Sequence, residues 1–337
     1  MNSKQPLITV LMAAYNTERY IAQAIQSILD QTYNNFELLI IDDCSLDGTL
    51  NEIRKFEDSR IRLLQNHTNQ GVVITRNRAL QEGKGEFIAI MDSDDIAIPD
   101  RLELLLNEFN KRPELVLIGG HADVIDPNGI PTGQKFKVET DPDLLRHLLF
   151  FGNNFTHSSI MMRMNVFREF NGYRIPLAED YDLFLRISTK YPVSNLDKCL
   201  LFYRDHTSGI SKKYALELEN QILPIKENIL RNIDLPSEIK YQKMITPPFE
   251  WPSISVIEYK KFYIQLLSRI NPSNESLSLR TYQFIFQKWY EVIMNNGKKN
   301  TLLYFFASPF FGWKYINAKQ LRRAFKNTFK NLFIFKK

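Results

Sequence analysis

Cysteine is scarce in this chain, whose 337 residues include only Cys44 and Cys199. Two such distant cysteines form neither a disulfide framework nor a metal-binding spacing, and they indicate a reducing compartment. Long apolar runs are also missing, since no stretch approaches the roughly 18 apolar residues of a membrane-spanning helix. The six apolar-leaning residues after Pro6 are too few for the core of a signal peptide. We therefore expect a cytoplasmic protein.

Acidic residues are absent from the last part of the chain. After Glu291 there are ten Lys and Arg residues and no Asp or Glu, whereas residues 1–291 hold 33 bases and 38 acids. Such an imbalance indicates an anionic partner for the basic part. Its apolar residues fall close to one face of a predicted helix: Leu321, Phe325, Phe329, Leu332 and Phe333.

Basic amphipathic helices of this kind lie in the headgroup plane of anionic membranes. The tail therefore predicts a protein that is peripheral on the inner face of the membrane. Packing on the catalytic domain with a solvated basic edge is one alternative. Nucleic-acid binding is another, but no binding motif supports it.

No glycine-rich loop follows the first predicted strand. That strand, at residues 7–12, leads instead into Ala13-Ala14-Tyr15-Asn16. A dinucleotide oxidoreductase would need G-x-G-x-x-G at this point. A nucleotidyltransferase would need a glycine-rich cradle for a triphosphate. Both classes are disfavoured.

Short apolar segments alternate with amphipathic helical patterns through the first 120 residues. This alternation predicts a mostly parallel α/β sheet, Rossmann-like, with helices on both faces. Ligands of such sheets bind beyond the carboxyl ends of the strands. We expect this domain to occupy residues 1–213 and a helical region with the basic tail to occupy 214–337. The predicted strands are 7–12, 36–41, 61–64, 86–91 and 115–118.

Polar residues cluster where three of these strands end. The fourth strand runs into Asp92-Ser93-Asp94-Asp95. Side chains alternate along an extended segment, so Asp92 and Asp94 point the same way. Two carboxylates together form a hard-oxygen site suited to Mg²⁺ or Mn²⁺ that also binds phosphates. The alternative is a turn and helix N-cap, because a helix follows Pro99.

The sequence resembles the family 2 inverting glycosyltransferases, which have the GT-A fold, over about residues 6–211. Many short motifs occur in the family's order, which makes the match more specific than a lone Asp-x-Asp. The carriers are Ile8–Asn16, Ser27–Thr32, Phe36–Thr49, Asn69-Gln70-Gly71, Thr75-Arg76-Asn77, Gly85–Asp95, Pro99-Asp100-Arg101, Ala178–Asp182, and Tyr203-Arg204 followed by His206 and Ser211.

The resemblance implies a nucleotide-sugar donor, most simply a UDP-sugar. Ala13 and Tyr15 would line the uracil pocket, and Asp43 would accept hydrogen bonds from the base. Arg76 would lie beside the donor, and Ser93 would belong to the same site.

The resemblance also implies the metal and the catalytic base. Asp92 would face the ribose and the metal, and Asp94 would be the main protein ligand of Mn²⁺ or Mg²⁺. His206 would complete the metal or diphosphate site, unless it is a solvent-exposed loop histidine. Asp180 would deprotonate the acceptor hydroxyl, and Glu179 would orient the acceptor.

Departures from the family pattern carry information too. The Gln-x-x-Arg-Trp signature of processive synthases is absent, so we expect one sugar to be added and released. The acceptor would be a glycan or a lipid-linked molecule in bacterial surface glycan synthesis. His157 would line the acceptor site or be a satisfied buried histidine, and Asp42 is expected to be structural. A non-catalytic sensor on this fold would be expected to lack Asp94 or Asp180, and both are present.

Overall fold

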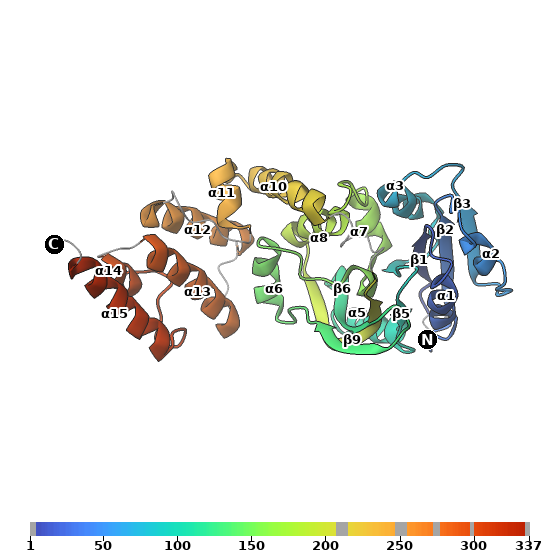
Figure 1. Cartoon of the computed structure of the whole chain (residues 1–337), viewed down its shortest axis with the longest axis horizontal. Helices are drawn as coiled ribbons and strands as arrows, with labels where there is room; N and C mark the ends of the chain where they lie inside the picture. The colour runs from blue at the N-terminus through green and yellow to red at the C-terminus, as the bar shows by residue number, and fades with distance from the viewer. Residues whose placement is uncertain (1–4, 207–214, 247–254, 272–276, 297–299, 334–337) are drawn as a thin grey trace. The chain divides into compact units, whose positions relative to one another are not determined.

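The computed structural model describes residues 5–206, 215–246, 255–271, 277–296 and 300–333 (Figure 1). The chain divides into two compact units. The first contains Met1–Pro142 with Asn153–Gln221, and the second contains Asp143–Gly152 with Ile222–Lys337. The domain boundary expected between residues 213 and 214 lies outside the described residues, as does Ser211.

Four parallel strands form the N-terminal half of the sheet in the first unit. Strand β1 (Ile8–Ala14) pairs with β2 (Phe36–Asp42) on one side and with β4 (Phe87–Ile90) on the other, and β2 also pairs with β3 (Ile61–Gln65). All residues of β2 and β4 are buried, as expected for parallel strands covered on both faces. The predicted parallel α/β sheet is thus confirmed for this half.

Amphipathic helices connect these strands. In α1 the buried residues are Ile21, Ala24, Ile25 and Ile28, the set whose spacing predicts a helix with one apolar face. The segment that follows Gly71 forms two short helices rather than one. The helices of this half are α1 (Ile21–Leu29), α2 (Thr49–Ile53), α3 (Val72–Asn77), α4 (Ala79–Glu82) and α5 (Arg101–Lys111).

The other half of the sheet is mixed. Strand β8 (Met161–Arg163) runs antiparallel between β4 and β6 (Leu117–Ile125), and β9 (Val193–Arg204) runs parallel to β6. The short β5 (Ile96–Ala97) pairs antiparallel with β9, and β7 (Pro131–Phe136) pairs antiparallel with β6. In the described residues the strand order is β3-β2-β1-β4-β8-β6-β9-β5, with β7 beside β6. This half brings the end of β9 next to β5, and β5 directly follows the acidic motif, which is Asp92-Ser93-Asp94-Asp95.

The connection between β6 and β7 contains a turn at 126–129. Asp126 Oδ1 accepts hydrogen bonds from the backbone N–H groups of Asn128 and Ile130, and Gly129 has a φ of +86°. A left-handed φ favours glycine at that position. The remaining helical elements of the first unit are η1 (His157–Ser159), α7 (Met164–Glu169) and α8 (Glu179–Lys190).

Where the structure describes the second unit, its regular elements are helices, as the sequence predicts. Aromatic side chains form much of its core, where the ring of Phe310 contacts those of Tyr263 and Trp289. Among the described helices, none is long and apolar enough to cross a membrane. Its described helices, the first two of which begin in the first unit, are α6 (Pro142–Leu149), α10 (Ala215–Asn232), α11 (Ile239–Met244), α12 (Val256–Ile270), α13 (Leu279–Asn296), α14 (Thr301–Phe306) and α15 (Ala318–Phe333).

Candidate active site

The carboxyl ends of β1 and β2 lie side by side. Ala14 is in register with Asp42, and the N–H of Asp43 donates to the carbonyl of Ala14 at 2.8 Å. Ala13 is half-buried and Tyr15 is exposed just beyond the strand. Parallel pairing therefore brings together three of the residues expected to bind the nucleotide.

Asp43 is buried and most of its hydrogen-bonding capacity is used within the protein. Its Oδ1 accepts from Asn66 Nδ2 at 2.6 Å and from the N–H of Gln70 at 2.9 Å, and its Oδ2 accepts from the N–H of Gly71 at 2.9 Å. Each carboxylate oxygen has about two acceptor positions. One position on Oδ2 therefore remains for a ligand. Its neighbour Asp42 accepts from the N–H and hydroxyl of Ser45, which agrees with a structural role.

Helix α3 carries the Thr-Arg-Asn motif, and each of its three side chains joins a different part of the site. Thr75 Oγ1 accepts from Asn66 at 3.0 Å. Asn77 exchanges two hydrogen bonds with the backbone of Tyr173. Arg76 donates to Asp92 Oδ1 at 2.8 Å and to Glu179 Oε1 at 2.6 Å. One guanidinium thus links the acidic motif after β4 to the first residue of α8.

The charges of this group stabilise one another. Burial opposes the charge of Arg76, but Asp92 and Glu179 outweigh it, so the pKa of Arg76 is raised. Burial would likewise raise the pKa of Asp92, but Arg76 and His157 together hold that pKa below its ordinary value. His157 Nδ1 lies 3.7 Å from Asp92, and its Nε2 lies 2.9 Å from the hydroxyl of Tyr173. His157 is therefore a largely buried histidine whose partners are Asp92 and Tyr173.

Asp94 lies beside His206. Their Oδ2 and Nε2 atoms are 2.9 Å apart, and the imidazole is largely buried, so His206 is not the exposed loop histidine considered as the alternative. Arg204 binds the acidic motif twice: its Nε donates to the carbonyl of Asp94 at 2.8 Å, and its own N–H donates to Asp95 Oδ1 at 2.9 Å. Both bonds join the end of β9 to the acidic motif, with Arg204 as the donor in each.

Asp95, the next residue after Asp94, is fully buried. Its Oδ2 accepts from the Ser158 hydroxyl at 2.5 Å. Burial, together with the negative charges of Asp94 and Asp92, raises the pKa of Asp95 well above its ordinary value. Arg101, also fully buried, donates to the carbonyl of Ile90 at 2.5 Å and so binds the last residue of β4. Burial lowers the pKa of Arg101 to about 10.

Glu179 and Asp180 form the start of α8. Glu179 Oε1 is bonded to Arg76, but its Oε2 is buried without a hydrogen-bond partner among the described residues. Asp180 is half-buried, and its Oδ2 accepts from Asn153 Nδ2 at 2.8 Å. A buried carboxylate oxygen that lacks a donor is costly. It indicates a place where a bound molecule supplies an N–H or O–H group.

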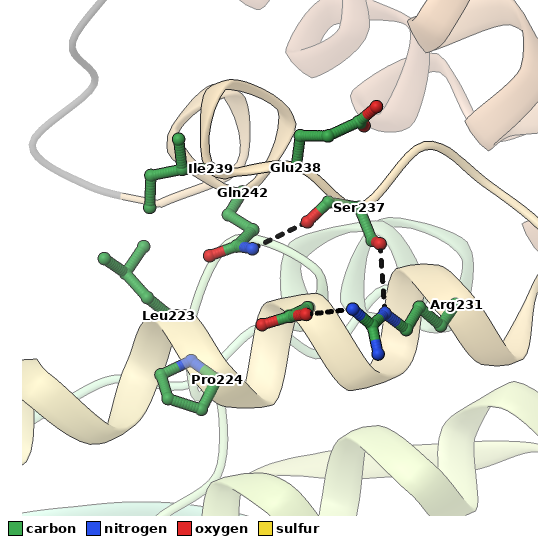
Figure 2. Close-up of a pocket in the computed structure, with 8 residues that line it drawn as sticks. Leu223, Pro224, Arg231, Ser237, Glu238, Ile239 and Gln242 are labelled. Atoms are coloured by element: carbon green, nitrogen blue, oxygen red, sulfur yellow. Dashed lines mark hydrogen bonds and ion pairs between the residues drawn. The ribbon is translucent and has the colours of Figure 1, made fainter.

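The helical unit contains a separate cavity of about 420 Å³ (Figure 2). Its lining comes from α10, from α11 and from the segment between them, and it includes none of the residues discussed above. The lining includes one basic side chain, Arg231. It forms an ion pair with Glu227 at 2.5 Å and also donates to the Ser237 hydroxyl. Since these polar groups bond to one another, the chemistry is assigned to the strand ends.

Comparison with known proteins identifies the family. The model of glycosyl transferase family 2 matches residues 9–170. EpsE of Bacillus subtilis (strain 168), itself only provisionally named a glycosyltransferase, is 33% identical over 232 residues, which cover 66% of this chain and 82% of that protein. The chain belongs to glycosyltransferase family 2. This enzyme is also 41% identical over 124 residues to an Escherichia coli protein named UDP-Glc:alpha-D-GlcNAc-diphosphoundecaprenol beta-1,3-glucosyltransferase WfgD, covering 37% of this chain and 49% of that one.

Solved structures agree on the GT-A fold of this glycosyltransferase. TarS 1-349 of S. aureus, in complex with UDP-GlcNAc, matches with a TM-score of 0.58 and 18% identity over 98% of this chain and 91% of that one. The mannosyltransferase PcManGT of Pyrobaculum calidifontis, in complex with GDP-Man and Mn²⁺, matches with a TM-score of 0.55 and 14% identity over 99% and 89%. The predicted family, fold class and enzyme class are confirmed.

The donor atoms of the site allow a test of the expected divalent metal. The described residues contain no group of three or more His, Cys, Asp or Glu side chains arranged to hold an ion. They do bring Asp94 together with His206, while Asp92 is occupied by Arg76. Mg²⁺ commonly takes one or two carboxylates and completes its shell with substrate phosphates and water. The pair therefore fits a metal that arrives with the diphosphate, and it favours Asp94 over Asp92 as the direct ligand.

Three further residues contact the candidate site residues, although the sequence predicts no role for them. Arg204 donates to the carbonyl of Asp94, Asn153 donates to Asp180, and Tyr173 contacts His157 and Asn77. From the sequence, Arg204 is recognised only as part of a family motif, two residues before His206. Asn153 has no such signal. Ser93, expected at the donor, is buried.

Proposed function

We propose that this enzyme transfers a single sugar from a UDP-sugar to a hydroxyl of its acceptor, with inversion at the anomeric carbon and Asp180 as general base. The observation that carries the proposal is the bridge from Asp92 through Arg76 to Glu179. It joins the motif expected at the donor to the residue beside Asp180. A carboxylate base must lie within hydrogen-bond reach of the hydroxyl it deprotonates.

The step is a single displacement. The acceptor oxygen forms a bond to the anomeric carbon while the bond from that carbon to the diphosphate oxygen breaks, and UDP leaves with the electron pair. Asp180 takes the acceptor proton, and Asn153 holds its carboxylate from the other side. The free Oε2 of Glu179 accepts a hydrogen bond from the acceptor and orients it. The acceptor attacks from the face opposite the leaving group, and this inverts the centre.

The hydrogen bonds of Asp43 favour uracil as the base. Uracil offers one ring N–H between two carbonyl groups, whereas guanine offers two adjacent donors that a carboxylate reads with both oxygens. Asn66 and Gln70 already use Oδ1 of Asp43, and a single position is left on Oδ2. The UDP-GlcNAc named for TarS and the UDP-Glc named for WfgD support the same choice.

A divalent ion, Mn²⁺ or Mg²⁺, would be held by Asp94 and His206 together with the diphosphate. When bound it would neutralise charge on the leaving group as a Lewis acid. The chain's own contribution is the direct contact of these two side chains at 2.9 Å, the bond of Arg204 to the Asp94 carbonyl, and the bond of Arg76 to Asp92, which holds Asp92 ready for the ribose. Mn²⁺ in the PcManGT complex supports the ion's presence here.

We place the catalytic domain at residues 1–213 and assign residues 214–337 to the helical region that follows. The acceptor is a glycan or lipid-linked molecule of bacterial surface glycan synthesis, and the enzyme works at the inner face of the membrane. The diphosphoundecaprenol acceptor in the name of WfgD supports a lipid-linked acceptor. Absence of the processive Gln-x-x-Arg-Trp signature from the sequence supports release after one sugar.

A panel of UDP-sugars with Mn²⁺ tests the proposal, with UDP release as the rate and NMR of the product as the readout of anomeric configuration. We expect one UDP-sugar to turn over and the product to have the opposite configuration. Binding without turnover of any donor, with acceptor glycans supplied, would make the chain a non-catalytic nucleotide-sugar-binding protein. Formation of a nucleotide sugar from a nucleoside triphosphate and a sugar phosphate would make it a nucleotidyltransferase.

A further inference from the structure

The last described helix, α15, is held in its unit by small and polar side chains. Ala324 is fully buried and Thr328 nearly so. Thr328 Oγ1 accepts from the N–H of Leu302 at 3.0 Å, and Asn327 Nδ2 donates to the carbonyl of Met294 at 3.2 Å. These bonds join one face of α15 to α14 and to the end of α13. Packing therefore uses a different face from the apolar one that the sequence predicts.

The opposite face of α15 presents aromatic rings and cations to solvent. Phe325 and Phe329 are 42% and 49% exposed, and their rings lie 6.5 Å apart at an interplanar angle of 13°. The side chains of Leu332 and Phe333, which belong to the predicted face, lie outside the described residues. Spacings of three and four residues bring exposed cations onto the same side of the helix. These cations are Lys319, Arg322, Lys326 and Lys330.

A second exposed apolar group lies on the neighbouring α14 and the segment after it. Leu303, Phe306 and Trp313 are 63%, 42% and 69% exposed, and the rings of Phe306 and Trp313 lie 6.2 Å apart. Soluble proteins rarely expose several large apolar side chains in one region without a partner. Tryptophan and basic residues are the types enriched where proteins meet the membrane interface.

We propose that the outward face of α15, defined by Arg322, Phe325, Lys326 and Phe329, docks on an anionic lipid bilayer. Charge complementarity selects this occupant, because no acid occurs after Glu291 to oppose the cations or to pair with a basic partner. Exposed phenylalanines between the bases match an interface that is apolar below and anionic above. The face is free to dock because α15 packs through Ala324 and Thr328 instead. This inference does not depend on the proposed reaction.

Co-sedimentation of the full chain with vesicles tests the docking face. We expect binding to phosphatidylglycerol-containing vesicles at low salt, weaker binding as salt rises, and little binding to phosphatidylcholine alone. Arg322→Glu with Lys326→Glu should lower binding at least tenfold, since each base near such a surface is worth about fivefold in affinity. Phe325→Ser with Phe329→Ser should lower it independently. Both pairs are exposed, so UDP binding should be unchanged and serves as the check of folding.

A matched control lies on α12 of the same unit, where Ile257 and Lys261 are also exposed and four residues apart. Ile257→Ser with Lys261→Glu should bind vesicles like the unmodified chain. The proposal is overturned if the unmodified chain ignores anionic vesicles, or if both α15 variants bind as tightly as the control. Binding to RNA or DNA without vesicle binding would also overturn it. Loss of sugar transfer alone would count against the proposed reaction and leave the docking result standing.

Discussion

Arg76 Nη1 lies 2.6 Å from Oε1 of Glu179, although 103 positions separate the two residues in the sequence. The same guanidinium reaches Asp92 at 2.8 Å. Arginine can do this because its planar fork presents several N–H donors in fixed directions. The proposed base, one residue after Glu179, is therefore tied directly to Asp92, which is proposed to face the donor.

Replacing Arg76 with lysine should break this tie while keeping a positive charge. A lysine ammonium is a point charge that cannot bridge two carboxylates in the same geometry. We expect Arg76→Lys to lower kcat/KM at least tenfold and Arg76→Ala to lower the free energy of unfolding by about 3–5 kcal/mol, as for a buried pair that loses one partner. Steady-state kinetics and urea titrations measure the two effects. Arg54→Lys, at an exposed position, is the control, and normal kinetics in Arg76→Lys would show that the bridge has no catalytic role.

Removing the proposed base should slow chemistry and spare binding. General-base catalysis contributes about 10²–10⁴-fold, so Asp180→Asn should lower kcat by about that factor. The asparagine keeps the size of the side chain, and UDP affinity, measured by calorimetry, should change little. Asp197→Asn is a suitable control, because the side chain of Asp197 is 89% exposed. A normal transfer rate in Asp180→Asn would place the base elsewhere.

The parallel half of the fold was predictable because its signal is local. The spacing of Ile21, Ala24, Ile25 and Ile28 determines which side of α1 is buried, and the strand Phe36–Ile41, apolar except for Glu37, indicates burial on both faces. The mixed half of the sheet was not predictable in this way. Its strands β8 and β5 have only three and two residues, and their direction depends on partner strands far along the chain.

The same distinction applies to the site. Asp92 and Asp94 could be proposed from their spacing and their position after a strand. The Arg76 bridge, the orphaned oxygen of Glu179 and the contact between Asn153 and Asp180 depend on tertiary distances that no spacing encodes. The tail illustrates the opposite failure. Helical periodicity identified an apolar face, but buried hydrogen bonds of Thr328 selected another face for packing.

The metal prediction separates Asp94 from Asp92. EDTA should abolish donor turnover, and Mn²⁺ or Mg²⁺ should restore it. His206→Gln and Asp94→Asn should raise the Mn²⁺ concentration needed for half-maximal rate, because both side chains are proposed ligands, by about 10–100-fold or more. Asp92→Asn should instead act on donor KM and on stability through Arg76, with a smaller change in the Mn²⁺ requirement. Full activity in EDTA would contradict the proposed metal requirement. Equal Mn²⁺ requirements in all three variants would contradict the assignment of Asp94 and His206 as ligands.

The hydrogen bonds of Asp43 predict which nucleotide binds. With one acceptor position left on Oδ2, we expect UDP to bind at least tenfold more tightly than GDP, a difference of about 1.4 kcal/mol. Isothermal titration calorimetry with both nucleotides at one Mn²⁺ concentration measures it. Asp43→Ala should weaken the binding of UDP and leave little difference between the affinities for UDP and GDP. Equal or tighter GDP binding by the unmodified protein would show that the carboxylate is read differently.

Lys226 predicts how the stability of the protein depends on pH. It is fully buried in α10, where its Nζ donates to the carbonyl of Phe150, and burial lowers its pKa well below the ordinary value. In the unfolded chain this lysine keeps its proton up to a pH of about 10.4. Between the folded and unfolded pKa values the unfolded state therefore binds more protons, so stability from this group rises with pH and is lost as pH falls through the folded pKa.

Lys226→Met should remove that dependence. From pH 7.5 to 9.0 the unmodified protein should gain up to about 2 kcal/mol in free energy of unfolding relative to the variant, since one proton is worth about 1.4 kcal/mol per pH unit. Urea titrations at the two pH values give the difference, whatever the methionine does to stability at a single pH. Lys261→Met, at an exposed position of α12, should track the unmodified protein. Parallel curves for Lys226→Met and the unmodified protein would mean that Lys226 keeps its ordinary charge inside the helical unit.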